Sequence, residues 1–412
     1  MDDSNYFFTL YSEYMVRCLH QFMTTDKTFV QSAQEVLNNN TSSSSDVYSF
    51  IDDIFPVAIS NLTKMAFVCQ SEIFKSLELD EKLPEKKDLL SEIRKKVSMQ
   101  NKTIGNSQLY KMIRESLVHT DTAHPNFQIT SPGNFALKLK PKGQAEINLQ
   151  LTNNEMLLIA SVFNLNLNNS MYEFKENPKL QQAIDKKKLT EKNLDEYLSL
   201  TRNGKPIKLD EYQREALLNY FYSYNEILKD TFSIGSANAE LFLTRIPFQA
   251  NEYNCFIASF RAILYLNCLK NHTNMNCIQF DKYFSNFIKA KKIPIREGVL
   301  VYPYEDIVSN LIISTFGNLA TTVDKKEFNE ILKKGGFRVD ETVSNQIRNS
   351  FAHGRFFINP KQEPAVEIYD GRNAENLTHI VTFPLKRMDK VLTKQIMAYD
   401  AQLPKEDAEQ TM

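Results

Sequence analysis

The chain has 412 residues, of which 42% are hydrophobic and 24% charged, and its formal net charge is −1. This length is enough for two or three domains with cores of ordinary size, and the near-zero charge argues against a coat of basic residues for non-specific nucleic-acid binding. Five cysteines, an odd number in so long a chain, argue against a disulfide framework and favour a reducing compartment. The chain starts with Met1-Asp2-Asp3 and contains no apolar run long enough to span a membrane, so we expect a cytoplasmic protein without a membrane partner.

The N-terminal part is expected to be helical, because its apolar residues recur at helical spacing. This pattern covers residues 4–37 and 47–70, which are separated by a polar, serine-rich break at 38–45. With 11 glycines and 14 prolines in the whole chain, long helices are the default expectation. A later helix carries the segment 113–119, Ile-Arg-Glu-Ser-Leu-Val-His.

After His119 the spacing of apolar residues changes from that of a helix to that of strands. Residues 135–140 and 145–151 alternate apolar and polar positions, and Pro141-Lys142-Gly143 joins them, which predicts a β-hairpin. Residues 171–235 are charged and helical in character, so we interpret them as a helical connector.

The second half of the chain repeats this order. A helical pattern over 239–271 precedes the segment 346–354, and then come a hairpin pattern around Asp370-Gly371 and a helix over about 385–399. The repetition predicts an internal duplication whose period is too long for a solenoid, so we expect two similar domains packed as a pseudo-symmetric pair. The predicted segments are domain 1 at 1–170, the helical connector at 171–235 and domain 2 at 236–412.

The residues that carry chemistry are an arginine and a histidine at the same spacing in both halves. Arg114 precedes His119 by five positions, and Arg348 precedes His353 by five. Cleavage of RNA by its own 2′-hydroxyl needs a proton acceptor, a proton donor and a fixed cation for the phosphorane oxygens. Histidine can serve as acid or base near neutrality, whereas arginine stays charged and binds phosphate in a bidentate manner. Two facing copies can therefore supply a complete site.

The surroundings of His353 also fit a site at the end of a helix. Asn349 stands four residues earlier and points to the same side of the helix. Gly354 suits a left-handed position just after the helix end, which places the imidazole in the last turn, where the helix dipole favours its protonated form.

The segment Arg348-Asn349-Ser350-Phe351-Ala352-His353 resembles the signature of HEPN (higher eukaryotes and prokaryotes nucleotide-binding) domains. Through the repeated layout the resemblance extends over 1–170 and 236–412. It implies a mainly α fold of two HEPN-like helical bundles, each with a small β-hairpin after the motif helix. It also implies a metal-independent endoribonuclease with one composite active site, whose products carry 2′,3′-cyclic phosphate and 5′-hydroxyl ends.

The resemblance carries catalytic roles over to Arg114, His119, Arg348, Asn349 and His353. The first copy departs from the family pattern, because Glu115 replaces the commoner amide and Thr120 replaces the glycine that follows the second histidine. It is therefore either active with a modified polar residue or decayed. The alternative function is a non-catalytic HEPN pair that binds RNA, a nucleotide or a protein partner.

RNA is the partner that the resemblance implies, in phage defence or as a toxin. A regulatory partner (an antitoxin, a guide RNA or an activator) and a homo-oligomer both fit this setting. No cofactor is expected, since Cys255, Cys268, His272 and Cys277 lack a CxxC pair and lie in an apolar helical stretch. The basic residues that can contact RNA are Lys138, Lys140, Lys289, Lys291, Lys292 and Arg355.

Overall fold

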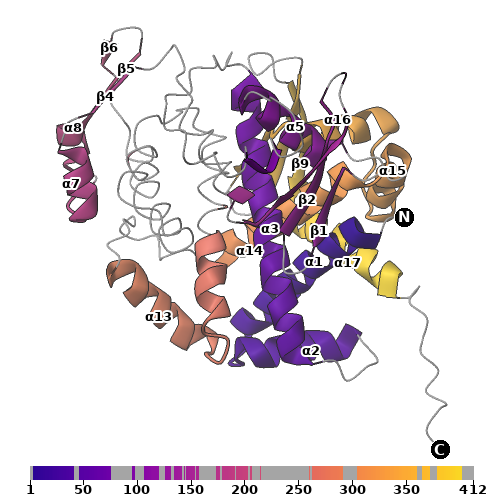
Figure 1. Ribbon diagram of the computed structural model, residues 1–412. Coiled ribbons are helices and arrows are strands. Elements are labelled where there is room, and N and C mark those ends of the chain that lie inside the picture. The colour runs from indigo at the N-terminus through magenta and orange to yellow at the C-terminus, as the bar shows by residue number, and fades with distance from the viewer. Residues whose placement is uncertain are drawn as a thin grey trace, which may run out of the picture.

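A computed structural model gives the arrangement of the chain (Figure 1). It describes residues 3–40, 46–75, 95–97, 106–119, 126–130, 134–141, 143, 145–153, 155–156, 173–176, 179–190, 192–202, 205–206, 214, 259, 262–290, 304–359, 364–371 and 378–400. The fold is mainly helical with small antiparallel sheets, which confirms the predicted class at this level. Within the described ranges, no helix combines the length and the apolar character that a bilayer span requires.

The helices predicted near the N-terminus are present as α1 (Asp3–Thr24), α2 (Phe29–Asn40) and α3 (Val47–Lys75). Met15, Leu19 and Phe22 recur at helical spacing along α1 and are fully buried. This face packs α1 against α2 and α3. The helix that carries the first motif, α5 (Asn106–Val118), packs against α3.

A three-stranded antiparallel sheet follows the first motif helix. Its strands, in spatial order, are β1 (Phe127–Thr130), β2 (Asn134–Leu139) and β3 (Ile147–Leu151). The predicted hairpin is confirmed as β2 and β3, in which Leu137 pairs with Leu149 and both are buried, while Lys138 is exposed. The additional strand β1 is only four residues long, which is too short for alternation to reveal it.

The second half has the same succession of a helix and a three-stranded sheet. Its elements are α13 (Cys277–Ala290), α14 (Tyr304–Thr322), α15 (Lys325–Lys334), α16 (Glu341–Ala352), β7 (Phe356–Asn359), β8 (Ala365–Asp370), β9 (Thr378–Pro384) and α17 (Leu385–Asp400). The sheet order is β7-β8-β9, again antiparallel. The hairpin predicted around Asp370-Gly371 is confirmed as β8 and β9, and the strand before it was again missed.

The described part of the predicted helical connector at 171–235 contains strands as well as helices. Two short helices lie there beside a three-stranded sheet, at one side of the molecule (Figure 1). Leu198-Ser199-Leu200-Thr201 alternates apolar and polar residues, and Asn203-Gly204 follows, which together form a hairpin signal that the charged composition of the segment obscured. The elements are β4 (Glu173–Glu176), α7 (Leu180–Asp185), α8 (Leu194–Tyr197), β5 (Leu198–Arg202) and β6 (Lys205–Pro206).

The two halves share one hydrophobic core. α14 packs against both α1 and α3, so helices from either half lie side by side at the centre of the molecule (Figure 1). Gly317 permits this approach, because a Cβ there would lie 2.8 Å from Met65 Cε and 2.8 Å from Phe351 Cδ1. The predicted domain boundaries remain a prediction, but the packing brings the helices that carry the two motifs onto one framework.

A buried lysine crosses the contact between α3 and α14. Lys64 is 4% exposed, and its Nζ donates to Asn318 Oδ1 at 2.6 Å and to Thr321 Oγ1 at 3.2 Å. Its Nζ also lies 4.4 Å from the centre of the Phe127 ring. Burial lowers the pKa of Lys64 to about 7.

Candidate functional site

The end of α16 fixes the position of His353. The helix ends at Ala352, His353 is the C-cap, and Gly354 follows with φ 63°. The N–H of Arg355 donates to the carbonyl of Ser350 at 2.8 Å, and that of Gly354 donates to the carbonyl of Phe351 at 3.4 Å. These two bonds form a Schellman motif. The left-handed conformation predicted for Gly354 is confirmed, and it ends the helix directly after the histidine.

A serine in each motif ties its helix to the middle strand of the following sheet. Ser350 Oγ lies 2.6 Å from the carbonyl oxygen of Tyr369 in β8. Ser116 Oγ lies 2.8 Å from the carbonyl oxygen of Lys138 in β2. Both serines are almost completely buried. Each motif helix is therefore held on its own sheet by the residue two positions after the motif arginine.

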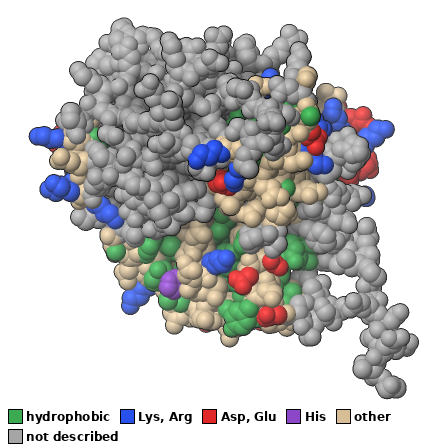
Figure 2. Space-filling view, in the orientation of Figure 1, with side chains coloured by type: hydrophobic (Ala, Val, Ile, Leu, Met, Phe, Trp, Pro, Cys, Tyr) green, Lys and Arg blue, Asp and Glu red, His purple; other side chains and the backbone are tan. Residues whose placement is uncertain are grey.

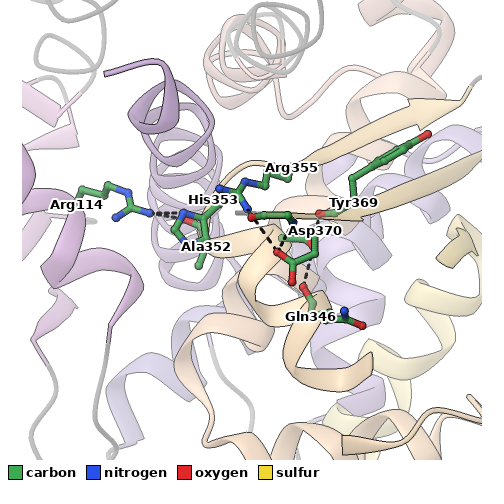
Figure 3. A network of polar contacts seen from close by, with 9 residues as sticks. Arg114, Gln346, Ala352, His353, Arg355, Tyr369 and Asp370 are labelled. Atoms are coloured by element: carbon green, nitrogen blue, oxygen red, sulfur yellow. Dashed lines mark hydrogen bonds and ion pairs between the residues drawn. The ribbon is translucent and has the colours of Figure 1, made fainter. Parts of the chain in front are cut away.

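The two motifs meet through Arg114 and His353. Arg114 Nη2 lies 2.8 Å from His353 Nδ1 and donates to the carbonyl of Ala352 at 3.2 Å (Figure 3). Arg114 is 7% exposed, so it reaches the end of α16 from within the protein. The arginine of the first half thus contacts the histidine of the second.

The contact also determines the tautomer of His353. A guanidinium has donors and no acceptor, so Nδ1 must accept the hydrogen bond from Arg114. Of the two neutral tautomers, the one that fits this contact carries its proton on Nε2. The expectation that the helix end favours the protonated ring stays a prediction.

His353 lines a pocket of about 530 Å³. Asn349 lines it too, as its position one turn before the histidine predicts, and it is exposed. Arg355 forms an ion pair with Asp370 at 3.4 Å, and its Nη1 donates to the carbonyl of Gly371. Figure 3 shows His353 with Arg114 on one side and the Arg355–Asp370 pair on the other. The other described residues that line it are Gln346, Gly371, Thr378 and Ile380.

Arg348 occupies a different place from Arg114. Its Nη1 donates to the carbonyl of Val323, just after the end of α14, and Arg348 is not among the residues that line the pocket. Burial lowers the pKa of Arg348, and Asp324 opposes this shift. The guanidinium nevertheless keeps its charge, so it stabilises the end of a helix where unpaired carbonyl groups gather.

His119 ends α5 as His353 ends α16. The N–H of His119 donates to the carbonyl of Glu115 at 3.0 Å. The side-chain amide of Asn126 donates to the carbonyl of His119. The His119 side chain is exposed. Asn126 thus contacts the backbone of the residue that corresponds to His353.

The predicted RNA-contacting residues fall into three groups. Lys138 and Lys140 are exposed on and beside β2, whereas Arg355 is paired with Asp370 and lines the pocket. The side chain of Lys289 lies outside the described part of the chain, as do residues 291–292. On the face in Figure 2, the basic side chains over α15 are interspersed with acidic ones.

The residues that sequence reasoning left without a role are Gln346, Asp370, Thr378 and the two motif serines. The serines share a position in both copies, which was a visible signal, but their function depends on a strand that follows much later in the chain. Gln346 lies on the same helix face as Asn349. Asp370 and Thr378 come together only because β8 pairs with β9.

The cysteines considered as metal ligands have other contacts. Cys268 is buried, the His272 ring packs on Tyr283 with 3.9 Å between ring centres, and Cys277 Sγ lies 3.7 Å from Asp281 Oδ2. Burial, together with Asp281, raises the pKa of Cys277 to about 12. Cys255, the remaining residue of that set, lies outside the described part of the chain.

Comparison of the chain with known protein families, with curated proteins and with solved structures finds no match in any of the three.

Proposed function

We propose that the protein is a metal-independent endoribonuclease whose active site combines Arg114 from the first half with His353 from the second. The single observation that carries the proposal is the 2.8 Å contact between these two side chains. A permanent cation beside a titratable imidazole, next to a pocket, is the combination that phosphodiester cleavage requires.

The reaction is an attack of the RNA 2′-oxygen on the neighbouring phosphorus. The bond between 2′-oxygen and phosphorus forms, the bond from phosphorus to the 5′-oxygen breaks, and the 2′-proton leaves to a base while the 5′-oxygen gains a proton from an acid. In this proposal the Arg114 guanidinium turns to the phosphate and stabilises the charge of the phosphorane. That movement releases His353 Nδ1, which then accepts the 2′-proton.

His119 is the proposed second acid or base. It follows Arg114 by five residues, which corresponds to about 7.5 Å along a helix axis, and we assign it to the phosphate that Arg114 binds. Its exposed side chain is compatible with a group that exchanges protons with substrate and water. Asn349 contributes to binding, and Arg348 supports the end of α14 rather than the chemistry.

The same proposal includes the relationship to HEPN domains and the pseudo-symmetric pairing of the halves. It is supported by the features that both halves share: a motif helix that ends at a histidine, a serine bonded to the middle strand, and a three-stranded antiparallel sheet. Phage defence or a toxin-like role is the setting that this relationship suggests.

One observation favours a second candidate, a non-catalytic pair that binds RNA. Arg348 donates to the carbonyl of Val323. It is therefore not available for a contact with His119, which would be the counterpart of the contact between Arg114 and His353. A protein of this kind binds single-stranded RNA without shortening it, which an electrophoretic binding assay and a cleavage assay on the same substrate distinguish.

Substrate analogues and a matched histidine control test the proposal. We expect the wild type to cleave single-stranded RNA in EDTA and to leave both DNA and 2′-O-methyl RNA intact, because these lack the nucleophile. His353→Ala should lower the rate by about 10² or more, whereas His20→Ala, an exposed histidine on α1, should leave it unchanged. Cleavage of DNA, or full activity in His353→Ala, would refute the assignment.

A further inference from the structure

The pocket beside His353 contains polar groups that take no part in the proposed proton transfers. Gln346 and Asn349 contribute side-chain amides from one face of α16, and Thr378 contributes a hydroxyl from the start of β9. Among the described residues, none of these three side chains has a hydrogen-bond partner. Each amide offers a donor and an acceptor side by side. The pocket is therefore equipped to bind a flat group with donors and acceptors along its edge.

Asp370 is held in place with one oxygen still available. Its Oδ1 accepts from the N–H of Gly371 at 2.9 Å and lies 3.4 Å from Arg355 Nη1. Within the described part of the chain, its Oδ2 has no partner. A fixed carboxylate oxygen is an acceptor only, so it selects ligands that present N–H donors.

The charge of the pocket favours a neutral group over a second phosphate. Among the described residues that line the pocket, Arg355 is the cation, and it is paired with Asp370, with side chains 10% and 19% exposed. Since the carboxylate offsets the guanidinium, an anion gains little there. The pocket volume, about 530 Å³, is in the usual range for small-molecule sites.

We propose that this pocket binds the base of the nucleotide next to the phosphate held by Arg114 and His353, and that it disfavours uracil. This inference rests on the proposed function. His353 forms a wall of the pocket and contacts Arg114 on its other side, so the base site and the phosphate site adjoin (Figure 3). Recognition of single-stranded RNA through such edge contacts is common.

The preference against uracil follows from the acceptor on Asp370. Guanine, adenine and cytosine each carry an exocyclic amino group that can donate to Oδ2. The ring donor of uracil, N3–H, is flanked by two carbonyl oxygens, which repel the carboxylate when N3–H approaches it. A carbonyl placed against the carboxylate leaves both acceptors without a proton between them. Asp370→Asn replaces one carboxylate oxygen by an amide N–H donor, which can bind a uracil carbonyl, so this variant should lose the preference against uracil.

Cleavage-site sequencing tests the proposal directly. A random-sequence RNA pool is digested in EDTA, and the base frequencies are counted on both sides of each cut. We expect the wild type to show uracil depleted at one fixed position by roughly 5-fold or more, the scale of a single lost base contact. Gln346→Leu should weaken this bias and Asp370→Asn should abolish it, while Gln34→Leu on α2 should match the wild type. Equal frequencies in the wild type, or a bias unchanged in both pocket variants, would overturn the proposal.

A binding measurement separates failure of the pocket from failure of the enzyme. Fluorescently labelled 2′-O-methyl oligonucleotides of adenosine, cytidine or uridine cannot be cleaved, so their affinity depends on binding alone. The wild type should bind the adenosine and cytidine oligomers more tightly than the uridine oligomer, and Asp370→Asn should narrow the difference. If the wild type cleaves no RNA but shows this difference, the nuclease proposal fails and the base site stands; equal affinities for all three oligomers would refute the base site.

Discussion

Arg114 and His353 lie 239 positions apart in the sequence, yet Nη2 of the arginine is 2.8 Å from Nδ1 of the histidine. The contact depends on two arrangements: α5 and α14 both pack on α3, and α16 packs on α14. It links the two copies of the motif through one arginine and one histidine, rather than within either copy.

Replacement of Arg114 should remove most of the cleavage activity. Arg114→Ala is expected to lower the rate by about 10² to 10³, the usual effect of deleting a group that stabilises transition-state charge. Arg114→Lys should recover only part of it, because an ammonium lacks the planar fork of donors. Single-turnover rates on a labelled RNA measure both. Lys111→Ala, a cation on the exposed side of the same helix, should keep wild-type activity; an equal loss there would point to general RNA attraction instead.

Replacement of Gly354 should lower both stability and cleavage activity, whereas replacement of Gly143, another glycine with positive φ, should lower stability alone. Gly354 and Gly143 have φ 63° and 71°, so an alanine at either position should cost about 1 kcal/mol of folding free energy. Only Gly354→Ala should also slow cleavage, because it displaces His353. Urea unfolding and cleavage rates measured on both variants make the comparison. Similar rates in the two variants would show that the helix end does not position the histidine.

The hydrogen bonds from Ser350 and Ser116 to the strand carbonyls should stabilise both halves. Ser350→Ala and Ser116→Ala each remove a buried hydroxyl from a strand carbonyl, with an expected cost of about 1 to 2 kcal/mol in the free energy of unfolding. Ser344→Ala is a matched control, because Ser344 is 1% exposed on the same helix as Ser350 and its hydroxyl has no partner among the described residues. That substitution should be neutral or stabilising. If Ser344→Ala were as costly as Ser350→Ala, the loss would reflect packing rather than the tie to the sheet.

Lys64 should make stability rise with pH on the alkaline side. Its pKa is about 7 when folded and near 10.5 when unfolded, so between these values the unfolded chain binds more protons. The free energy of unfolding should therefore increase from pH 7 to 10.5, by up to about 1.4 kcal/mol per pH unit from this group. Lys64→Met should remove that contribution from the measured slope, whereas Lys111→Met should leave it. An unchanged slope in Lys64→Met would contradict the burial of a neutral lysine.

Glu13 should have the opposite effect at lower pH. It is 1% exposed, receives a hydrogen bond from Thr393 Oγ1 at 3.3 Å, and its pKa is raised from 4.5 to about 8, chiefly by burial and then by Asp389. Its stabilising contribution is present below pH 4.5 and is lost as the pH rises through 8. Glu13→Gln should therefore raise Tm at pH 8, with Glu330→Gln on the surface as the control. A lower Tm in Glu13→Gln at pH 8 would show that the carboxylate is ionised and stabilising.

The sequence was most informative where structure is local. Periodicity located the long helices and both hairpins, and Gly354 predicted the helix end, because these features depend on neighbouring residues. The strands β1 and β7 are four residues each and stayed hidden. The sheet at 173–206 was obscured by a charged composition. The contact partner of each motif arginine could not be predicted from the sequence, because Arg114 and Arg348 have the same local pattern. Tertiary packing places Arg114 beside His353 and Arg348 beside the carbonyl of Val323.

The most direct test of a composite ribonuclease site is end-group analysis of RNA incubated with purified protein in EDTA. We predict that the wild type produces fragments with 2′,3′-cyclic phosphate and 5′-hydroxyl ends, and that Arg114→Ala and His353→Ala each lose this activity. The double variant should be little slower than the slower single variant, because the two residues act as a unit. The account would be contradicted if the wild type left the RNA intact, or if cyclic-phosphate ends formed as fast in both single variants.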